Sequence, residues 1–162
     1  MTEPQPHPAP AQPDSPATPT GAGIDPRGPR FGAALTAVVL AIALLTGNVW
    51  VLAIQAVIFG TGSLLGLSYS PYSYVYRSFV RPRLSPPSEL EDPAPPRFAQ
   101  TVGLAVTVVG LILNAAGVGV AVEASAAVAL IAALLNAVFG LCLGCEMYLL
   151  LARLRGPRPA AS

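Results

Sequence analysis

Charged side chains are scarce in this sequence, and lysine is absent. Of the 162 residues, 10% are charged and 53% are hydrophobic, and the mean hydropathy is +0.60. So few charges cannot cover the surface of a water-soluble globule, which indicates an integral membrane protein whose first partner is the lipid bilayer. The net charge of +1 gives no indication of nucleic acid, and no nucleic-acid partner is expected.

Charged residues are rarer still in the two long apolar runs. Residues 31–69 contain none, and residues 98–145 contain only Glu123. No Asp, Lys or His lies in either run, which argues against a proton-coupled transporter. A helical span needs roughly 20 apolar residues, so each run is long enough for two closely spaced helices. We expect an all-α membrane protein with four transmembrane helices as two tandem hairpins, with helices over residues 30–46, 49–67, 98–117 and 124–153.

Composition divides the chain into five segments. Proline recurs through residues 1–24 among few large apolar residues, which predicts a disordered, Pro/Ala-rich cytoplasmic tail without a cleaved signal. The other four are a first helical hairpin (25–69), a cytoplasmic interfacial loop and linker (70–97), a second helical hairpin that carries Cys-x-x-Cys (98–155) and a C-terminal tail (156–162).

One short pattern occurs twice. Asp-Pro-x-x-Pro-Arg-Phe stands at residues 25–31 and again at 92–98, and each copy leads into an apolar run. We interpret this as an internal duplication. Because each unit holds an even number of spans, the two copies should be parallel, related by an axis along the membrane normal.

The arginines predict the orientation in the membrane. All nine basic residues are Arg, at positions 27, 30, 77, 81, 83, 97, 153, 155 and 158. Each lies before the first span, between the second and third, or after the fourth. Short loops rich in Arg stay in the cytoplasm, so we expect a multi-pass inner-membrane protein with both termini cytoplasmic.

The two cysteines, Cys142 and Cys145, are the candidate site. On a continuous helix their spacing places both thiols on one face, about one turn apart. A Cys-x-x-Cys pair facing the reducing cytoplasm is typical of catalysis or metal binding rather than of a permanent structural disulfide. Glu146 adds a titratable group beside Cys145, and these three are the candidate catalytic residues.

Two other interpretations stay open. Buried cysteines pack like small hydrophobes, and Gly140-x-x-x-Gly144 is a helix-packing motif, so the segment is also compatible with a non-enzymatic scaffold or assembly subunit. Alternatively, a homodimer joined through the glycine face would gather four thiolates, and Cys142 and Cys145 would then be metal ligands.

The expected helix position opposes thiol reactivity. In a helix over residues 124–153 the cysteines lie in the C-terminal half, where the helix dipole and the apolar surroundings both disfavour a thiolate. Arg153 or the arginines of the loop would have to compensate. An interruption of the helix at Gly144 would weaken the objection.

These residues suggest a family. The Pro-Arg-Phe-Ala sequence before the third span, and Gly-x-Cys-x-Gly-Cys-x-x-Tyr at residues 140–148, resemble the small bacterial membrane proteins grouped as domain of unknown function 4395. The resemblance covers residues 25–153. Other members often carry an additional Cys-Pro near the amino end, where this chain has Asp25-Pro26. The family has no established activity.

The resemblance and the motif together give a functional hypothesis. The resemblance implies that genes of this family are neighbours of genes for thioredoxin-like proteins and sulfurtransferases in actinobacterial genomes. It therefore implies a cytosolic partner of one of these kinds. We therefore expect cytosol-facing thiol-disulfide or sulfur-relay chemistry at Cys142 and Cys145. The sequence shows no quinone or haem signature, so it identifies neither a cofactor nor an electron acceptor.

Overall fold

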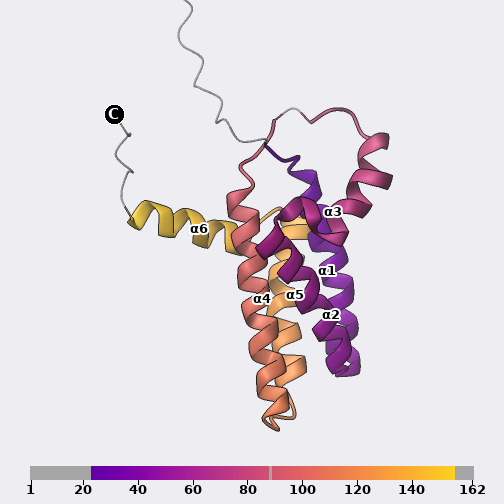
Figure 1. The fold of residues 1–162 in the computed structure, drawn as a ribbon, viewed down its shortest axis with the longest axis vertical. Coiled ribbons are helices and arrows are strands. Elements are labelled where there is room, and N and C mark those ends of the chain that lie inside the picture. Colours follow the sequence, from indigo (N-terminus) through magenta and orange to yellow (C-terminus); the bar gives the residue numbers. More distant parts are fainter. Residues whose placement is uncertain (1–22, 88, 156–162) are drawn as a thin grey trace, which may run out of the picture.

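The computed structural model describes residues 23–87 and 89–155, and within them the regular elements are all helices, apart from one isolated β-bridge (Figure 1). The prediction of an all-α fold is confirmed. The two expected tails lie mostly outside these residues. The elements are α1 (Arg27–Thr46), α2 (Val49–Gly60), the π-helix η1 (Thr61–Leu65), the 3-10 helix η2 (Leu67–Tyr69), α3 (Pro71–Val75), the π-helix η3 (Tyr76–Val80), the 3-10 helix η4 (Arg81–Arg83), α4 (Ala94–Ala115), α5 (Ala121–Phe139) and α6 (Leu143–Leu154).

Four helices form an upright bundle, and α6 leaves it at a steep angle (Figure 1). Around the bundle, α1 packs on α2, α2 on α4, α4 on α5, and α5 on α1. Both hairpins begin and end at the same end of the bundle, from which α6 and the segment between the hairpins also extend (Figure 1). Tandem parallel hairpins, as the repeated motif predicts, have this order.

The repeated motif folds the same way twice. The Asp25 carboxylate accepts the backbone N–H of Arg27 at 3.0 Å, and the Asp92 carboxylate accepts that of Ala94 at 2.9 Å. Each aspartate thereby satisfies one of the free N–H groups at a helix start. The residues just before them, Ile24 and Glu91, pair with each other as an antiparallel bridge. The two copies of the motif therefore meet through equivalent residues.

The arginines of the two motif copies, Arg30 and Arg97, also occupy equivalent positions. Arg97 donates to the carbonyls of Ser63 and Leu64, at the end of the first hairpin's second helix. The Arg30 guanidinium lies beside Gly140, at the end of the second hairpin's second helix. Each motif thus places a cation at a helix C-terminus of the other hairpin, where carbonyl dipoles attract it.

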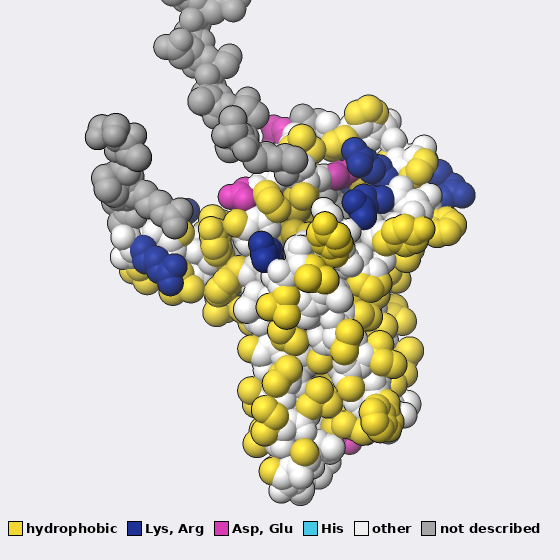
Figure 2. Space-filling model, in the orientation of Figure 1, with side chains coloured by type: hydrophobic (Ala, Val, Ile, Leu, Met, Phe, Trp, Pro, Cys, Tyr) yellow, Lys and Arg dark blue, Asp and Glu magenta, His cyan; other side chains and the backbone are white. Residues whose placement is uncertain are grey.

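Small side chains fill the interior, and large apolar ones face outward. The core includes Ala37, Ala43, Ala126, Ala129 and Ala133, with Leu40, Leu52 and Val122. Leu45 is 84% exposed and Val57 67% exposed, and hydrophobic side chains cover the visible face of the bundle (Figure 2). Small interfacial residues allow close helix approach in lipid, and an apolar surface this extensive is rare on soluble monomers.

Among the residues that the structure describes, three helices are long and apolar enough to cross a membrane: α1, α4 and α5. The continuous helix formed by α2 and η1 is shorter, from Val49 to Leu65. It ends because Gly66 has φ 106°, a conformation that interrupts helical hydrogen bonding. The four apolar segments expected from the sequence are therefore all present, one of them in a shortened form.

The expected fourth helix is wrong in its extent. The sequence predicts one helix over residues 124–153, whereas the structure ends α5 at Phe139 and starts α6 at Leu143. Gly140 adopts the left-handed conformation with φ 71°, and its N–H donates to the Asn136 carbonyl. A left-handed glycine with this bond is a common helix terminator. The apolar pattern continues across the break, which is why composition does not reveal it.

Candidate functional site

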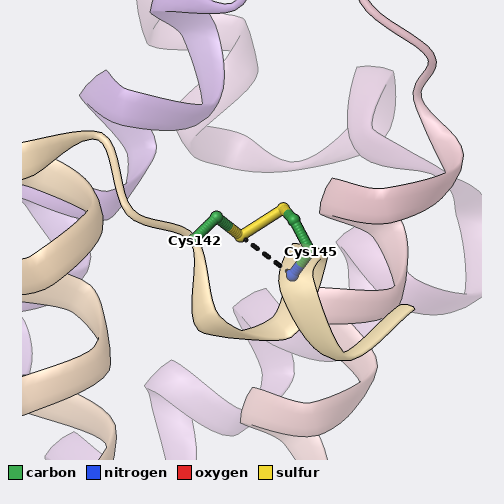
Figure 3. The surroundings of a disulfide bond; sticks show 2 residues. All are labelled: Cys142 and Cys145. Carbon is green, nitrogen blue, oxygen red and sulfur yellow. Dashed lines mark hydrogen bonds between the residues drawn. A yellow bond between two sulfur atoms is a disulfide. The ribbon is translucent and has the colours of Figure 1, made fainter. Parts of the chain in front are cut away.

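The candidate site is the corner between α5 and α6. After Gly140 the chain turns, and Cys142 adopts an extended conformation at the N-cap of α6. Its Sγ accepts the backbone N–H of Cys145 at 3.3 Å (Figure 3). Cysteine here takes the place of the Ser, Thr, Asp or Asn that usually caps a helix.

Cys142 and Cys145 are joined by a disulfide, the oxidised state of the pair (Figure 3). Their Cα atoms are 5.1 Å apart, within the range that a disulfide spans. The Cys-x-x-Cys spacing predicts both thiols on one face of a continuous helix. Instead, Cys142 is the N-cap of α6 and Cys145 lies in its first turn. Both residues are half-buried.

Two contacts hold the first turns of α6 against α4. Gly144 packs on Ala99 so closely that a Cβ on Gly144 would lie 2.6 Å from the Ala99 Cα. One turn later, the Tyr148 and Phe98 rings lie 5.8 Å apart. Gly144 therefore serves close packing within the chain. Gly140 ends a helix, so Gly140 and Gly144 do not form the helix-packing motif expected from their spacing.

The local electrostatics are the opposite of those expected from the sequence. At the N-terminus of α6, free N–H groups and the positive end of the helix dipole favour a thiolate at Cys142. The nearby cation is Arg30, whose guanidinium carbon would lie 3.4 Å from a Cβ on Gly140. Sequence reasoning missed Arg30 and proposed Arg153, which lies in the last turn of α6. The signal for Arg30 was its place in the repeated motif.

Glu146 lies in the first turn of α6 and is exposed. Its backbone N–H donates to the Cys142 carbonyl at 3.0 Å. Glu146 therefore lies in the same first turn of α6 as Cys145, and its side chain is exposed to solvent.

A cavity of about 390 Å³ lies beside the disulfide. Its walls are mostly apolar and include Ala33 of α1, Gly103 of α4 and Ala132 of α5, while Cys142 and Gly144 lie at its α6 side. Cys145 does not line it. The small side chains of three helices leave this space open, because no larger group in this part of the chain fills it.

The polar residues of the apolar runs have different roles. Gln55, fully buried, donates to Thr36 Oγ1 at 3.5 Å and accepts the Tyr72 hydroxyl at 2.7 Å. Gln55 therefore joins α2 to α1 and α3 through hydrogen bonds between side chains. Asn48 instead caps α2 by accepting the Trp50 N–H. Asn136 lines the cavity that Cys142 also lines.

Glu123, the one charged residue of the second apolar run, is not fully exposed to solvent. It is half-buried, and its Oε2 is buried without a hydrogen-bond partner among the described residues. Its other carboxylate oxygen would come within 2.6 Å of a Cβ on Gly47, so it lies against the turn between α1 and α2.

The metal alternative needs more ligands than one chain provides. Within residues 23–87 and 89–155, no three His, Cys, Asp or Glu side chains gather where they could hold a metal ion. A four-thiolate site would require reduction of the disulfide and a second copy of the chain.

The fold and the site define a class: a small all-helical bundle with apolar helices, closed at one corner by a Cys-x-x-Cys disulfide. Comparison with known families assigns the chain within that class. The family model described as Domain of unknown function (DUF4395) matches residues 24–153. The chain belongs to this family, as the resemblance implied. No curated protein and no solved structure matches it.

Proposed function

We propose that this protein crosses a bacterial inner membrane and exchanges disulfides with a cytosolic partner through Cys142 and Cys145. The observation that carries the proposal is the Cys142–Cys145 disulfide at the N-terminus of α6. A disulfide facing a reducing compartment is typically catalytic or transient rather than structural.

The bundle supports membrane insertion with four crossings. At 1.5 Å per residue, α5 is roughly 28 Å long, which fits a hydrocarbon core of about 30 Å. Arginines lie at the end of the bundle where both hairpins begin, and the lower half of the visible face shows none (Figure 2). By the positive-inside rule, that end and the disulfide face the cytoplasm.

In this arrangement α6 lies along the cytoplasmic membrane surface. It leaves the bundle steeply (Figure 1) and exposes Leu150 and Leu154 as well as Arg153 and Arg155. An amphipathic helix of this composition buries its apolar face among the lipid headgroups. The cytosolic partner therefore reaches the disulfide beside the membrane.

The exchange uses the different positions of the two sulfurs. A thiolate of the partner attacks Cys145 Sγ, the S–S bond breaks, and Cys142 leaves as a thiolate. Cys142 is the better leaving group because the α6 N-terminus stabilises its negative charge, and a more stable thiolate leaves faster. The partner's second thiol then attacks the mixed disulfide, and Cys145 leaves in turn. The partner is oxidised by two electrons, and the pair becomes a dithiol.

Glu146 is placed to carry protons in this exchange. Its exposed carboxylate can take the proton of an attacking thiol and return one to the Cys145 thiolate. A thioredoxin-like protein supplies the required pair of thiols, whereas a sulfurtransferase would instead deliver a persulfide sulfur to the same site.

Trapping tests the proposal. In Cys142→Ser, the exchange can run only in the reverse direction: Cys145 attacks the disulfide of an oxidised partner and displaces one of its thiolates. The resulting mixed disulfide persists, because no Cys142 thiol is present to attack Cys145 Sγ and release the partner. We expect acid-quenched cells to contain a crosslinked species that is removed by reductant and absent from Cys145→Ser. Alkylation with a mass-tagged maleimide should show that both thiols of the wild-type protein oxidise together and reversibly after a brief diamide pulse.

If the cysteines are only packing residues, the trapping experiment should give the opposite result. The close contact of Gly144 with Ala99 favours this interpretation, since it shows that the segment has a structural role. If both Cys→Ser variants accumulate normally, trap nothing and leave the thiols unreactive until the membrane is solubilised, the cysteines are packing residues and the exchange proposal is wrong.

A further inference from the structure

The cavity beside Cys142 restricts what can bind next to the disulfide. Its volume of about 390 Å³ lies in the range of small-molecule sites. Apolar residues form most of its wall, chiefly alanine and valine of α1, α4 and α5 with larger side chains such as Phe59 and Met147, so an occupant is largely apolar. Because α1, α4 and α5 are the helices long and apolar enough to cross a membrane, such an occupant would come from the membrane rather than from the cytosol.

A few polar groups interrupt this wall. Asn136 and Gln100 both line the cavity. Gln100 also lies against Gly62, where an added Cβ would come within 3.0 Å of the Gln100 Oε1. Thr36, a residue that is 5% exposed, is a third polar residue of the lining. Side-chain amide N–H groups in an otherwise apolar pocket suit a ligand with carbonyl oxygens.

The third restriction is chemical. Cys142 lines the cavity and Cys145 does not, so an occupant lies next to the sulfur that leaves as a thiolate during exchange. After one exchange with a partner the pair is a dithiol, and a second turnover requires an acceptor of two electrons. An acceptor in this cavity must therefore be apolar, carry carbonyl groups and accept two electrons with two protons.

We propose that the cavity binds a membrane quinone, which reoxidises the Cys142–Cys145 dithiol. This inference depends on the proposed exchange function and specifies its electron acceptor. The reaction balances: two S–H bonds break and one S–S bond forms, while the quinone takes two electrons and two protons and becomes a hydroquinone. The amides of Asn136 and Gln100 hold the quinone oxygens, and the isoprenoid tail extends along the helices toward lipid.

The test uses the full-length protein in phospholipid nanodiscs. After reduction and removal of the reductant, a short-chain ubiquinone is added, and the loss of its ultraviolet absorbance is followed alongside disulfide formation. We expect one quinone reduced per disulfide formed. Ala132→Phe, which fills the cavity, should slow quinone reduction roughly tenfold or more, while the rate of exchange with a dithiol reagent stays the same.

Matched variants distinguish the effect of filling the cavity from an effect on folding. Ala105 lies on α4, is exposed and does not line the cavity, so Ala105→Phe should leave both rates unchanged. If Ala132→Phe does not fold, Ala132→Leu fills less space and should show a smaller effect in the same direction. Asn136→Leu should raise the quinone KM without changing the rate of dithiol exchange.

Three outcomes would contradict the inference or its basis. Equal quinone reduction by wild type and Ala132→Phe would overturn the cavity assignment. A pair that exchanges readily with thiols but never reduces quinone, with a phospholipid acyl chain retained in the cavity, would overturn the quinone proposal and leave the exchange function intact. A pair that exchanges with no thiol would overturn the exchange function itself.

Discussion

Gly144 of α6 lies directly on Ala99 of α4, with no space for a side chain between the two backbones. A Cβ on Gly144 would lie 2.6 Å from both the Cα and the Cβ of Ala99. This contact fixes the first turn of α6, and therefore the disulfide, against the bundle. The position of the cysteines is thus set by a residue far away in the sequence.

Enlarging Gly144 should loosen this corner. Gly144→Val forces α6 away from α4, and we expect a loss of about 1–3 kcal/mol in stability, as for other overpacked sites. Thermal unfolding in detergent measures it, and maleimide labelling after reduction should show faster access to Cys142. Gly119→Val is the matched control, since nothing lies within 4 Å of a Cβ there. Equal effects of the two substitutions would contradict the packing argument.

Substitution of Gly140 should also lower the stability of the protein, for a different reason. Its φ of 71° is left-handed, and an alanine there carries a backbone penalty of roughly 1–2 kcal/mol. Asparagine tolerates this conformation better, so Gly140→Asn should be milder than Gly140→Ala. Comparison of the two melting temperatures checks this. If both variants melt like the wild type, the left-handed conformation of Gly140 does not contribute to stability, and the argument from its φ is wrong.

The two motif aspartates should differ in importance. Asp92→Ala removes one bond at a helix start, which typically costs about 1 kcal/mol. Asp25→Ala should cost more, because Asp25 also accepts the Tyr76 hydroxyl at 2.8 Å and lies 3.9 Å from the Arg27 guanidinium. Unfolding of both variants in the same detergent gives the comparison. An equal loss would show that the Tyr76 contact contributes nothing.

Because of Tyr72 and Tyr76, we expect the folded state to become less stable at high pH. Burial, together with the hydrogen bond to Asp25 and its negative charge, raises the pKa of Tyr76 to about 12, although Arg27 and Arg81 partly oppose the shift. Burial also raises the pKa of Tyr72 to about 12. Because the fold favours the neutral phenols, their contribution is complete below pH 10 and is lost as the pH rises toward 12.

Phenylalanine substitutions isolate this effect. Tyr76→Phe and Tyr72→Phe should each flatten the decline in melting temperature between pH 10 and 12, and the double variant should flatten it most. Tyr74, which is 64% exposed, is the control, and Tyr74→Phe should preserve the wild-type decline. A decline that persists unchanged in the double variant would show that other groups cause it.

The repeat is more extensive than its sequence pattern indicates. Phe31 and Phe98 end the two motif copies, and each ring lies 5.8 Å from a tyrosine, Tyr76 and Tyr148 respectively. These tyrosines lie on short helical segments that follow the two hairpins. The repeating unit is thus a hairpin followed by a shorter helical segment. The sequence conceals this because a tyrosine and a turn of helix are too common to mark a repeat by themselves.

The sequence by itself determined the helical class, the four apolar segments, the family and the local structure at Asp25 and Asp92. These features depend on composition and on neighbouring residues, since hydropathy over about 20 residues and a side chain two positions away are both local properties. The same reasoning marked Cys142 and Cys145 as the candidate site, and their catalytic role stays a prediction.

Only the tertiary structure decided where the cysteines lie. The apolar sequence runs through Gly140 without a change, so the choice between a continuous helix and a corner depends on a left-handed glycine, on Ala99 beneath Gly144 and on Arg30 beside the corner. The cavity likewise exists because small residues from three helices face one another. Such contacts join residues distant along the chain, and no local pattern encodes them.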